Sequence, residues 1–211
     1  MKLYTYFRSS ASFRVRIALN LKGIVYEPCF VSLPRGEHRA AEFSELNPQA
    51  LVPLLVTDDG MRLAQSLAII EYLDDVYPRP AMLPKDPKGR ARVRSLSQLV
   101  ACEIHPLNNL RVLQHLKRAL GQNEEQLNAW YRHWIADGLG KLEAEMAKMQ
   151  GRYSHGDSPT MADCCLVPQI FNARRYQCDL APYPTVMRVF DECMKLEAFD
   201  IAQPSKQPDA E

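Results

Sequence analysis

Residues 3–22 read LYTYFRSSASFRVRIALNLK and contain the beginning of the fold. Residues 3–7 are rich in aromatic and other strand-forming side chains, which predicts a strand. From residue 12 to residue 22 the apolar side chains recur at helical spacing, and Arg14 and Lys22 are expected on a different face of this helix. A strand that leads directly into a helix is the first half of a β-α-β unit, which requires a second, parallel strand.

The rest of the first eighty residues alternates between short apolar runs and helical patterns. Pro28 favours an edge position for its strand, because proline cannot donate a hydrogen bond to a neighbouring strand. Asp59-Gly60 between two apolar runs predicts a hairpin, and Ser66 is a candidate N-cap. The order β-α-β-α-β-β-α is that of a thioredoxin-like domain, which we place at residues 1–80. The further elements expected here are strands at 25–31, 52–56 and 61–64 and helices at 37–46 and 67–76.

Strand patterns end at residues 78–87, where prolines are dense enough to predict a linker. Only helical patterns follow, so we predict an all-helical domain at residues 88–211. The chain as a whole is then α/β plus all-α, with a thioredoxin-like domain followed by a helical bundle. The helices of the second domain are expected at 88–120, 124–150, 160–177 and 184–196.

Three local signals concern the second half of the chain. Thr160 and Asp163 resemble a capping box at the start of a helix. Pro168 is expected to kink or split that helix, because proline lacks the N–H that a helix interior needs. The tail from Gln203, which contains two prolines, is expected to be loose.

The composition excludes several classes of function. With 26 basic and 25 acidic residues the net charge is +1, which offers no basic surface to nucleic acid or to a membrane. No apolar run is long enough to span a bilayer, and Arg8 interrupts any secretory signal at the N-terminus. The six cysteines form no C-x-x-C and lie beside no histidine pair, so we expect no metal site and reduced thiols in the cytoplasm.

Three places in the first domain suit an anionic or peptide-like ligand. The turn at residues 8–12 offers an arginine and three serines at a helix N-terminus, which suits a phosphate, a carboxylate or a thiolate, although the serines could simply cap the helix. Pro53 either begins an edge strand or follows a cis bond, which would turn the backbone of Val52 toward an extended ligand. Gln65 and Ser66 precede another helix and suit a carboxylate, or only a cap.

Residues 9–19, SSASFRVRIAL, resemble the signature of the zeta-class glutathione transferases. The similarity extends from residue 1 to about residue 202, and it is greatest to the bacterial maleylacetoacetate and maleylpyruvate isomerases. Other stretches typical of the class lie at 47–53, 65–66, 104–109, 156–163 and 166–169.

The resemblance implies a glutathione transferase fold in which the thioredoxin-like domain binds glutathione as a cofactor. Ser10 would hydrogen-bond the glutathione sulfur, with Ser9 and Arg8 as further catalytic candidates beside it. The class commonly has a cysteine where this chain has Ala11, so that thiol is not required here and haloacid side activity is in doubt. The glutathione contacts implied are Ser10, Ala11, His38, Gln49, Val52, Pro53, Gln65, Ser66 and Asn109.

The resemblance also implies a reaction, which is the cis-trans isomerisation of maleylacetoacetate or maleylpyruvate by reversible thiolate addition, in tyrosine or gentisate breakdown. Such a dicarboxylate substrate requires cations, for which the candidates are Arg8, His105, Arg111 and Arg175. This polar set favours an isomerase over a general glutathione transferase or peroxidase, and over a non-catalytic binding protein. The family further implies a homodimer.

Overall fold

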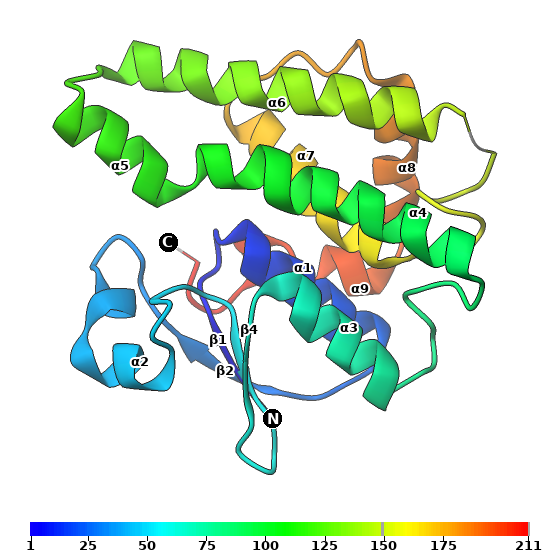
Figure 1. Cartoon of the computed structure of the whole chain (residues 1–211), viewed down its shortest axis with the longest axis horizontal. Helices are drawn as coiled ribbons and strands as arrows, with labels where there is room; N and C mark the ends of the chain where they lie inside the picture. Colours follow the sequence, from blue (N-terminus) through cyan, green and yellow to red (C-terminus); the bar gives the residue numbers. More distant parts are fainter. Residues whose placement is uncertain (149, 211) are drawn as a thin grey trace. The chain divides into compact units, whose positions relative to one another are not determined.

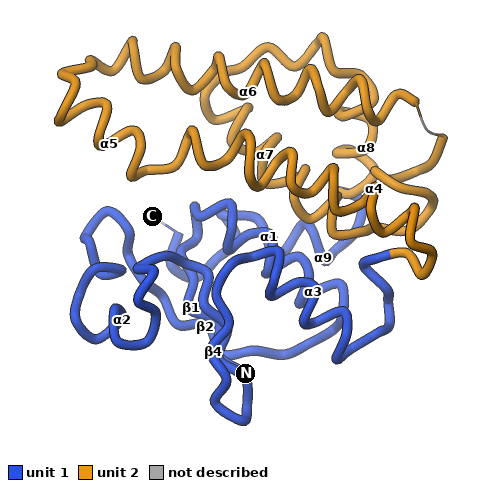
Figure 2. The backbone as a smooth tube through the Cα atoms, in the orientation of Figure 1, with its two compact units in different colours: residues 1–83, 194–211 blue, residues 84–193 orange. Residues whose placement is uncertain are grey.

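The protein is described by a computed structural model for residues 1–148 and 150–210. The chain divides into two compact units, unit 1 at residues 1–83 and 194–211 and unit 2 at residues 84–193 (Figure 2). The expected helical domain at 88–211 is therefore too long at its C-terminal end. Its last segment packs within unit 1, where helix α9 (Glu197–Asp200) lies against the first helix.

Unit 1 contains a four-stranded sheet in the order β2-β1-β3-β4. The first two strands pair in parallel, and the other two pairs are antiparallel, as the predicted β-α-β unit and hairpin require. Pro28 lies in an edge strand, because β2 has a partner on one side only. The strands are β1 (Lys2–Thr5), β2 (Glu27–Phe30), β3 (Leu54–Val56) and β4 (Arg62–Ala64).

The first helix of unit 1, α1 (Ser10–Leu21), is buried on nearly all sides, since it packs against both α3 (Ser66–Val76) and α9 (Figure 1). Arg14, which was expected on a different face from the apolar residues, is nevertheless buried, since its residue is only 2% exposed. The side chain of Lys22 is also buried. These cations are accommodated inside unit 1 because each has a hydrogen-bond acceptor there. The remaining helix of this unit, α2 (Ala41–Leu46), precedes the hairpin.

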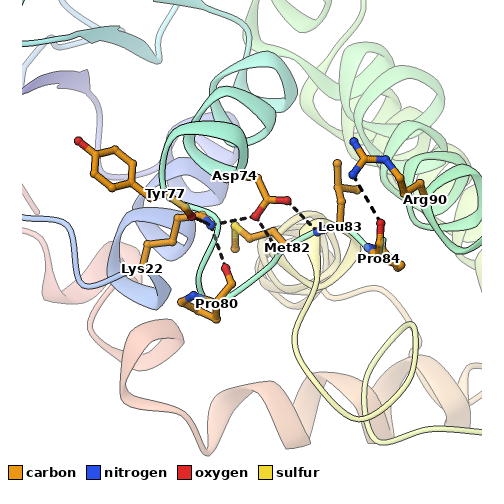
Figure 3. A network of polar contacts seen from close by, with 8 residues as sticks. All are labelled: Lys22, Asp74, Tyr77, Pro80, Met82, Leu83, Pro84 and Arg90. Carbon is orange, nitrogen blue, oxygen red and sulfur yellow. Dashed lines mark hydrogen bonds and ion pairs between the residues drawn. The ribbon is translucent and has the colours of Figure 1, made fainter. Parts of the chain in front are cut away.

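A buried ion pair organises the proline-rich segment that was expected to be a linker (Figure 3). The Lys22 ammonium donates to Asp74 Oδ1 at 2.9 Å and to the backbone carbonyls of Tyr77 and Pro80 at 2.6 and 2.9 Å. The Asp74 carboxylate also accepts two backbone N–H groups of the segment, at 2.7 and 3.1 Å. Residues 80–83 of the segment are thus bound to the Lys22–Asp74 pair.

The tail after Gln203 is ordered by hydrogen bonds, which corrects the expectation of a loose end. Residues Pro204–Lys206 form a 3₁₀ turn. The Gln207 side-chain amide donates to the carbonyls of Ile201 and Gln203, at 2.8 and 3.0 Å, and the Asp209 carboxylate accepts a hydrogen bond from the Phe7 N–H.

Unit 2 is helical, but its first expected helix, at 88–120, is interrupted. Residues Leu99–Ile104 are π-helical and His105–Asn108 form a 3₁₀ turn that contains Pro106. By contrast Pro168 does not split its helix. Within the described residues no helix is long and apolar enough to cross a membrane. The helices are α4 (Pro87–Gln98), α5 (Leu110–Ala119), α6 (Glu124–Met146), α7 (Met161–Arg175) and α8 (Pro184–Met194).

The predicted capping box at the start of α7 is present. The Asp163 carboxylate accepts hydrogen bonds from the N–H and the hydroxyl of Thr160, at 2.7 and 2.9 Å. Its other oxygen accepts the Ser154 N–H at 2.8 Å. Burial raises the pKa of Asp163, while these hydrogen bonds act in the opposite direction.

Candidate functional site

The turn between β1 and α1 separates the roles of its serines. Ser9 is the N-cap of α1, and its hydroxyl accepts the Ser12 N–H at 3.2 Å. Ser10 is the first residue of the helix and is 6% exposed, and Ala11 beside it is half-buried. The Ser10 hydroxyl therefore lies at the positive end of a helix dipole, which favours a bound anion.

Arg8 lies one residue before the cap and is exposed. Its guanidinium carbon is 4.8 Å from the centre of the Phe7 ring, which is itself buried. A cation over an aromatic face is attracted to the ring, which favours one position of the Arg8 side chain. Arg8 is thus placed in the same turn as Ser10, as the sequence requires.

The loop before β3 and the end of β4 meet through two amide side chains. The Gln65 Nε2 donates to Gln49 Oε1 at 2.6 Å, and both residues are exposed. Between them in sequence, Val52 and Pro53 are joined by a cis peptide bond, one of the two expected arrangements. Both of these residues are buried.

Ser66 does not cap α3, which corrects the expected role. Gln65 holds the N-cap position with a φ of 71° and makes no capping hydrogen bond with its side chain. Ser66 is instead the first residue of the helix, and its hydroxyl accepts a hydrogen bond from Arg14 Nη1 at 3.2 Å. This arrangement places a buried cation beside the Ser66 hydroxyl.

His38 lies in the 3₁₀ turn Glu37–Arg39 and is 9% exposed. Its Nδ1 is buried and has no hydrogen-bond partner among the described residues. Burial, together with the charge of Arg39, lowers the pKa of His38, so the ring is neutral at neutral pH. Because a buried polar nitrogen is costly without a partner, it is a natural contact for a bound ligand.

The residues predicted at 105–111 lie in unit 2, where the first long helix is interrupted. His105 is half-buried in the 3₁₀ turn, and Arg111 is exposed on α5. Asn109 is the N-cap of α5, and its Oδ1 accepts the Arg111 N–H at 3.2 Å. The Asn109 side-chain oxygen therefore has a structural partner.

Arg175 is the last residue of α7 and is exposed, with its guanidinium carbon 5.4 Å from the centre of the Tyr176 ring. That ring stacks on Tyr131 at 3.5 Å. Burial raises the pKa of Tyr131, and the Arg175 charge partly offsets this shift. Since the Tyr131 carbonyl accepts a hydrogen bond from Asn108 at 3.4 Å, Tyr131 links Arg175 to the segment at 105–109.

Three polar residues of unit 1 that contact the site or the backbone leading to it were not among the predicted site residues, namely Arg14, Arg16 and Asp209. A signal for the two arginines exists, because the helix around them is apolar on several sides and such a helix is buried. No signal marks Asp209. A hollow of about 410 Å³ lies beside it and includes none of the predicted site residues. It is lined by Tyr6, Phe30, Ser32, Arg35, Glu37, Pro208, Asp209 and Ala210.

Comparisons with known proteins show the fold and the family of the chain. A family profile described as "Glutathione S-transferase, N-terminal domain" matches residues 8–76. A maleylpyruvate isomerase of Ralstonia sp is 51% identical over 100% of both chains. The holo structure of a maleyl pyruvate isomerase, described as a bacterial glutathione S-transferase in the Zeta class, has a TM-score of 0.97 at 50% identity and covers 100% of both chains.

A maleylacetoacetate isomerase from Methylobacterium extorquens AM1, solved with bound malonate and glutathione, has a TM-score of 0.97 at 41% identity and again covers 100% of both chains. The fold is therefore that of a glutathione transferase. The chain belongs to the zeta class of this family, in the group of maleylpyruvate and maleylacetoacetate isomerases.

Proposed function

We propose that this protein is a glutathione-dependent cis-trans isomerase that converts maleylacetoacetate or maleylpyruvate into the fumaryl isomer. The observation that carries the proposal is the Ser10 hydroxyl at the first residue of α1, in a chain that matches a maleylpyruvate isomerase over its full length. A hydroxyl at a helix N-terminus favours a thiolate over a thiol.

Unit 1 fits glutathione as the cofactor, by the chemistry of its polar groups. The buried Nδ1 of His38 lacks a partner among the described residues, which suits the glycyl end. Gln65 and Ser66 suit the γ-glutamyl carboxylate, with the Arg14 cation beside them. Glutathione, when bound, supplies the thiolate that adds to the substrate double bond and leaves again after rotation.

The chain's own residues then have distinct proposed roles. Ser10 donates a hydrogen bond to the sulfur and so lowers the pKa of the thiol. The backbone of Val52, next to Pro53, pairs with the cysteinyl part of the tripeptide. Further contacts to glutathione are proposed for Ala11, Gln49 and Asn109, the last through its amide nitrogen because its oxygen caps α5.

The two substrate carboxylates require cations, because an unpaired carboxylate is costly to desolvate. We assign this role to Arg8, in the same turn as Ser10, and to His105, Arg111 and Arg175 of unit 2. Arginine suits the task because its planar group binds a carboxylate through two parallel hydrogen bonds. Unit 2 is accordingly proposed as the substrate-binding unit.

The cellular setting is proposed on similar grounds. The described residues form no disulfide, which agrees with a reducing cytoplasm. A homodimer and a role in aromatic catabolism, through homogentisate or gentisate, follow from family membership.

The test is an ultraviolet isomerisation assay of the purified protein on maleylpyruvate, with and without glutathione. We expect conversion to the fumaryl product only when glutathione is present. Conjugation of a chloro-nitroaromatic compound without isomerisation would instead indicate a general transferase. Failure to bind immobilised glutathione would indicate a non-catalytic relative and would overturn the proposal.

A further inference from the structure

The peptide groups of Phe7 are held on both sides, two residues before the N-cap of α1. Its N–H donates to Asp209 Oδ2 at 3.0 Å, and its carbonyl accepts from Arg16 Nη2 at 3.0 Å. The turn continues without a break, because the Ser9 N–H donates to the Tyr6 carbonyl at 3.0 Å. The backbone that leads to Ser10, the proposed partner of the glutathione thiolate, is thus bound to two charged groups, Asp209 and Arg16.

The C-terminal segment, residues 202–209, contains one of these charged groups, Asp209, and binds the other, Arg16. Arg16 donates from Nε and Nη2 to the Ala202 carbonyl, at 3.1 and 3.0 Å, so one guanidinium joins this segment to β1 and α1. Both Arg16 and Ala202 are 1% exposed. Hydrogen bonds of a charged group are strong when they are removed from water.

The Arg16 side chain remains a cation under physiological conditions. Burial lowers its pKa to about 10, and the charges of Tyr26 and Asp209 partly offset this effect. The guanidinium donates hydrogen bonds to the carbonyl oxygens of Phe7 and Ala202, and the charge of the Asp209 carboxylate favours its protonated form. The C-terminal segment therefore contacts the backbone after β1 both through Asp209 and through Arg16.

We infer that Asp209 is a positioning residue for the thiolate site, which it serves by fixing the Phe7 backbone and hence the Ser10 hydroxyl. The inference rests on the proposed function, in that Ser10 is taken as the partner of the glutathione sulfur. Only Arg8 and Ser9 separate the fixed peptide from Ser10. A displacement of about 1 Å at a reacting group is enough to cost roughly a hundredfold in rate.

A positioning role and a purely electrostatic role make opposite predictions. As a negative charge near the sulfur, Asp209 alone would raise the pKa of bound glutathione, so its removal would lower that pKa. If Asp209 instead orders the turn by accepting a hydrogen bond, its removal would weaken the hydrogen bond from Ser10 to the glutathione sulfur and raise that pKa. The direction of the shift therefore separates the two roles.

The test uses the full chain with the variants Asp209→Ala, Asp209→Asn and, as a control in the same segment, Lys206→Ala. Lys206 lies in the same segment, but its ion pair is with Asp200. For each variant, kcat and KM for maleylpyruvate are measured, and the thiolate absorbance of bound glutathione is titrated against pH. If D209A does not fold, Asp209→Glu takes its place, because one added methylene moves the carboxylate away from the Phe7 N–H.

We expect D209A to lower kcat roughly tenfold and to raise the pKa of bound glutathione, because a charge-assisted hydrogen bond is lost. D209N retains an acceptor oxygen, so it should restore most of the rate, and K206A should behave as wild type. An unchanged or lowered pKa in D209A would overturn the inference. Wild-type protein that binds glutathione without isomerising would contradict only the proposed function, since the titration still tests Asp209; wild-type protein that binds no glutathione would overturn both.

Discussion

Arg14 Nη1 donates a hydrogen bond to the Ser66 hydroxyl at 3.2 Å, and so joins the helix that begins with Ser10 to the first residue of α3. Both residues are buried, at 2% and 6% exposed. The proposed site for the γ-glutamyl carboxylate therefore has a cation behind its hydroxyl. This pairing couples the two helix N-termini that the sequence singled out separately.

Replacement of Arg14 by methionine should weaken glutathione binding roughly tenfold, because the carboxylate loses a charged neighbour and Ser66 loses its donor. Arg14→Lys keeps the charge and should lose less affinity. Isothermal titration of glutathione into each variant measures the effect. Equal affinities of R14M and wild type would remove Arg14 from the site.

Ser10→Ala should lower turnover about a hundredfold, chiefly because the pKa of bound glutathione rises when its hydrogen-bond donor is lost. Ser9→Ala is the matched control, since Ser9 caps the helix. It should cost about 1 kcal/mol of unfolding free energy, with a smaller loss of rate. Steady-state kinetics and urea unfolding of both variants test this division, and a larger rate loss in S9A would reverse the assignment.

Arg175→Ala should raise the KM for the dicarboxylate substrate roughly tenfold, with glutathione affinity intact, because one carboxylate loses its partner. Arg174→Ala provides a neighbouring control, as the Arg174 guanidinium lies over the Phe190 ring at 4.3 Å. Substrate saturation curves at fixed glutathione distinguish the two residues. A raised KM in R174A alone would transfer the role to Arg174.

Asp74→Ala should destabilise the protein by about 3–5 kcal/mol, because the buried Lys22 ammonium loses its counter-charge. Lys22→Met should cost less, about 1–3 kcal/mol, since Asp74 keeps two backbone N–H donors. Urea unfolding of both variants gives the two free energies. An equal or reversed order would show that the pair does not stabilise the proline-rich segment in this way.

Much of unit 1 could be predicted from local patterns. Phe13 and Ile17 recur at helical spacing, Pro28 indicated an edge strand, and Asp59-Gly60 indicated the hairpin. These patterns did not indicate that Arg14 is buried. Spacing identifies a helix, but it does not reveal that α3 and α9 pack against α1, or that Ser66 and Asp74 of α3 accept hydrogen bonds from Arg14 and Lys22.

The candidate site, too, could be predicted only in part. The serines at residues 9, 10 and 12 and their place before a helix follow from the sequence, yet only the structure shows that Ser9 is the cap. Ser66 was expected to be a cap for the same local reason, and the structure assigns its hydroxyl to Arg14. Several neighbouring side chains can cap a helix N-terminus equally well by their sequence position, and the packing around the helix determines which one does.

The order of elements, the resemblance to glutathione transferases and the serines of the turn at residues 8–12 could be recognised without a structure, because short motifs and local patterns carry them. The contact of Asp209 with Phe7, 202 positions away along the chain, and the hydrogen bonds that hold the tail from Gln203 are visible only in the folded protein. Contacts at such separation leave no periodic trace in the sequence. They arise when the burial of apolar surface brings distant segments together, after which each buried polar group must find a partner.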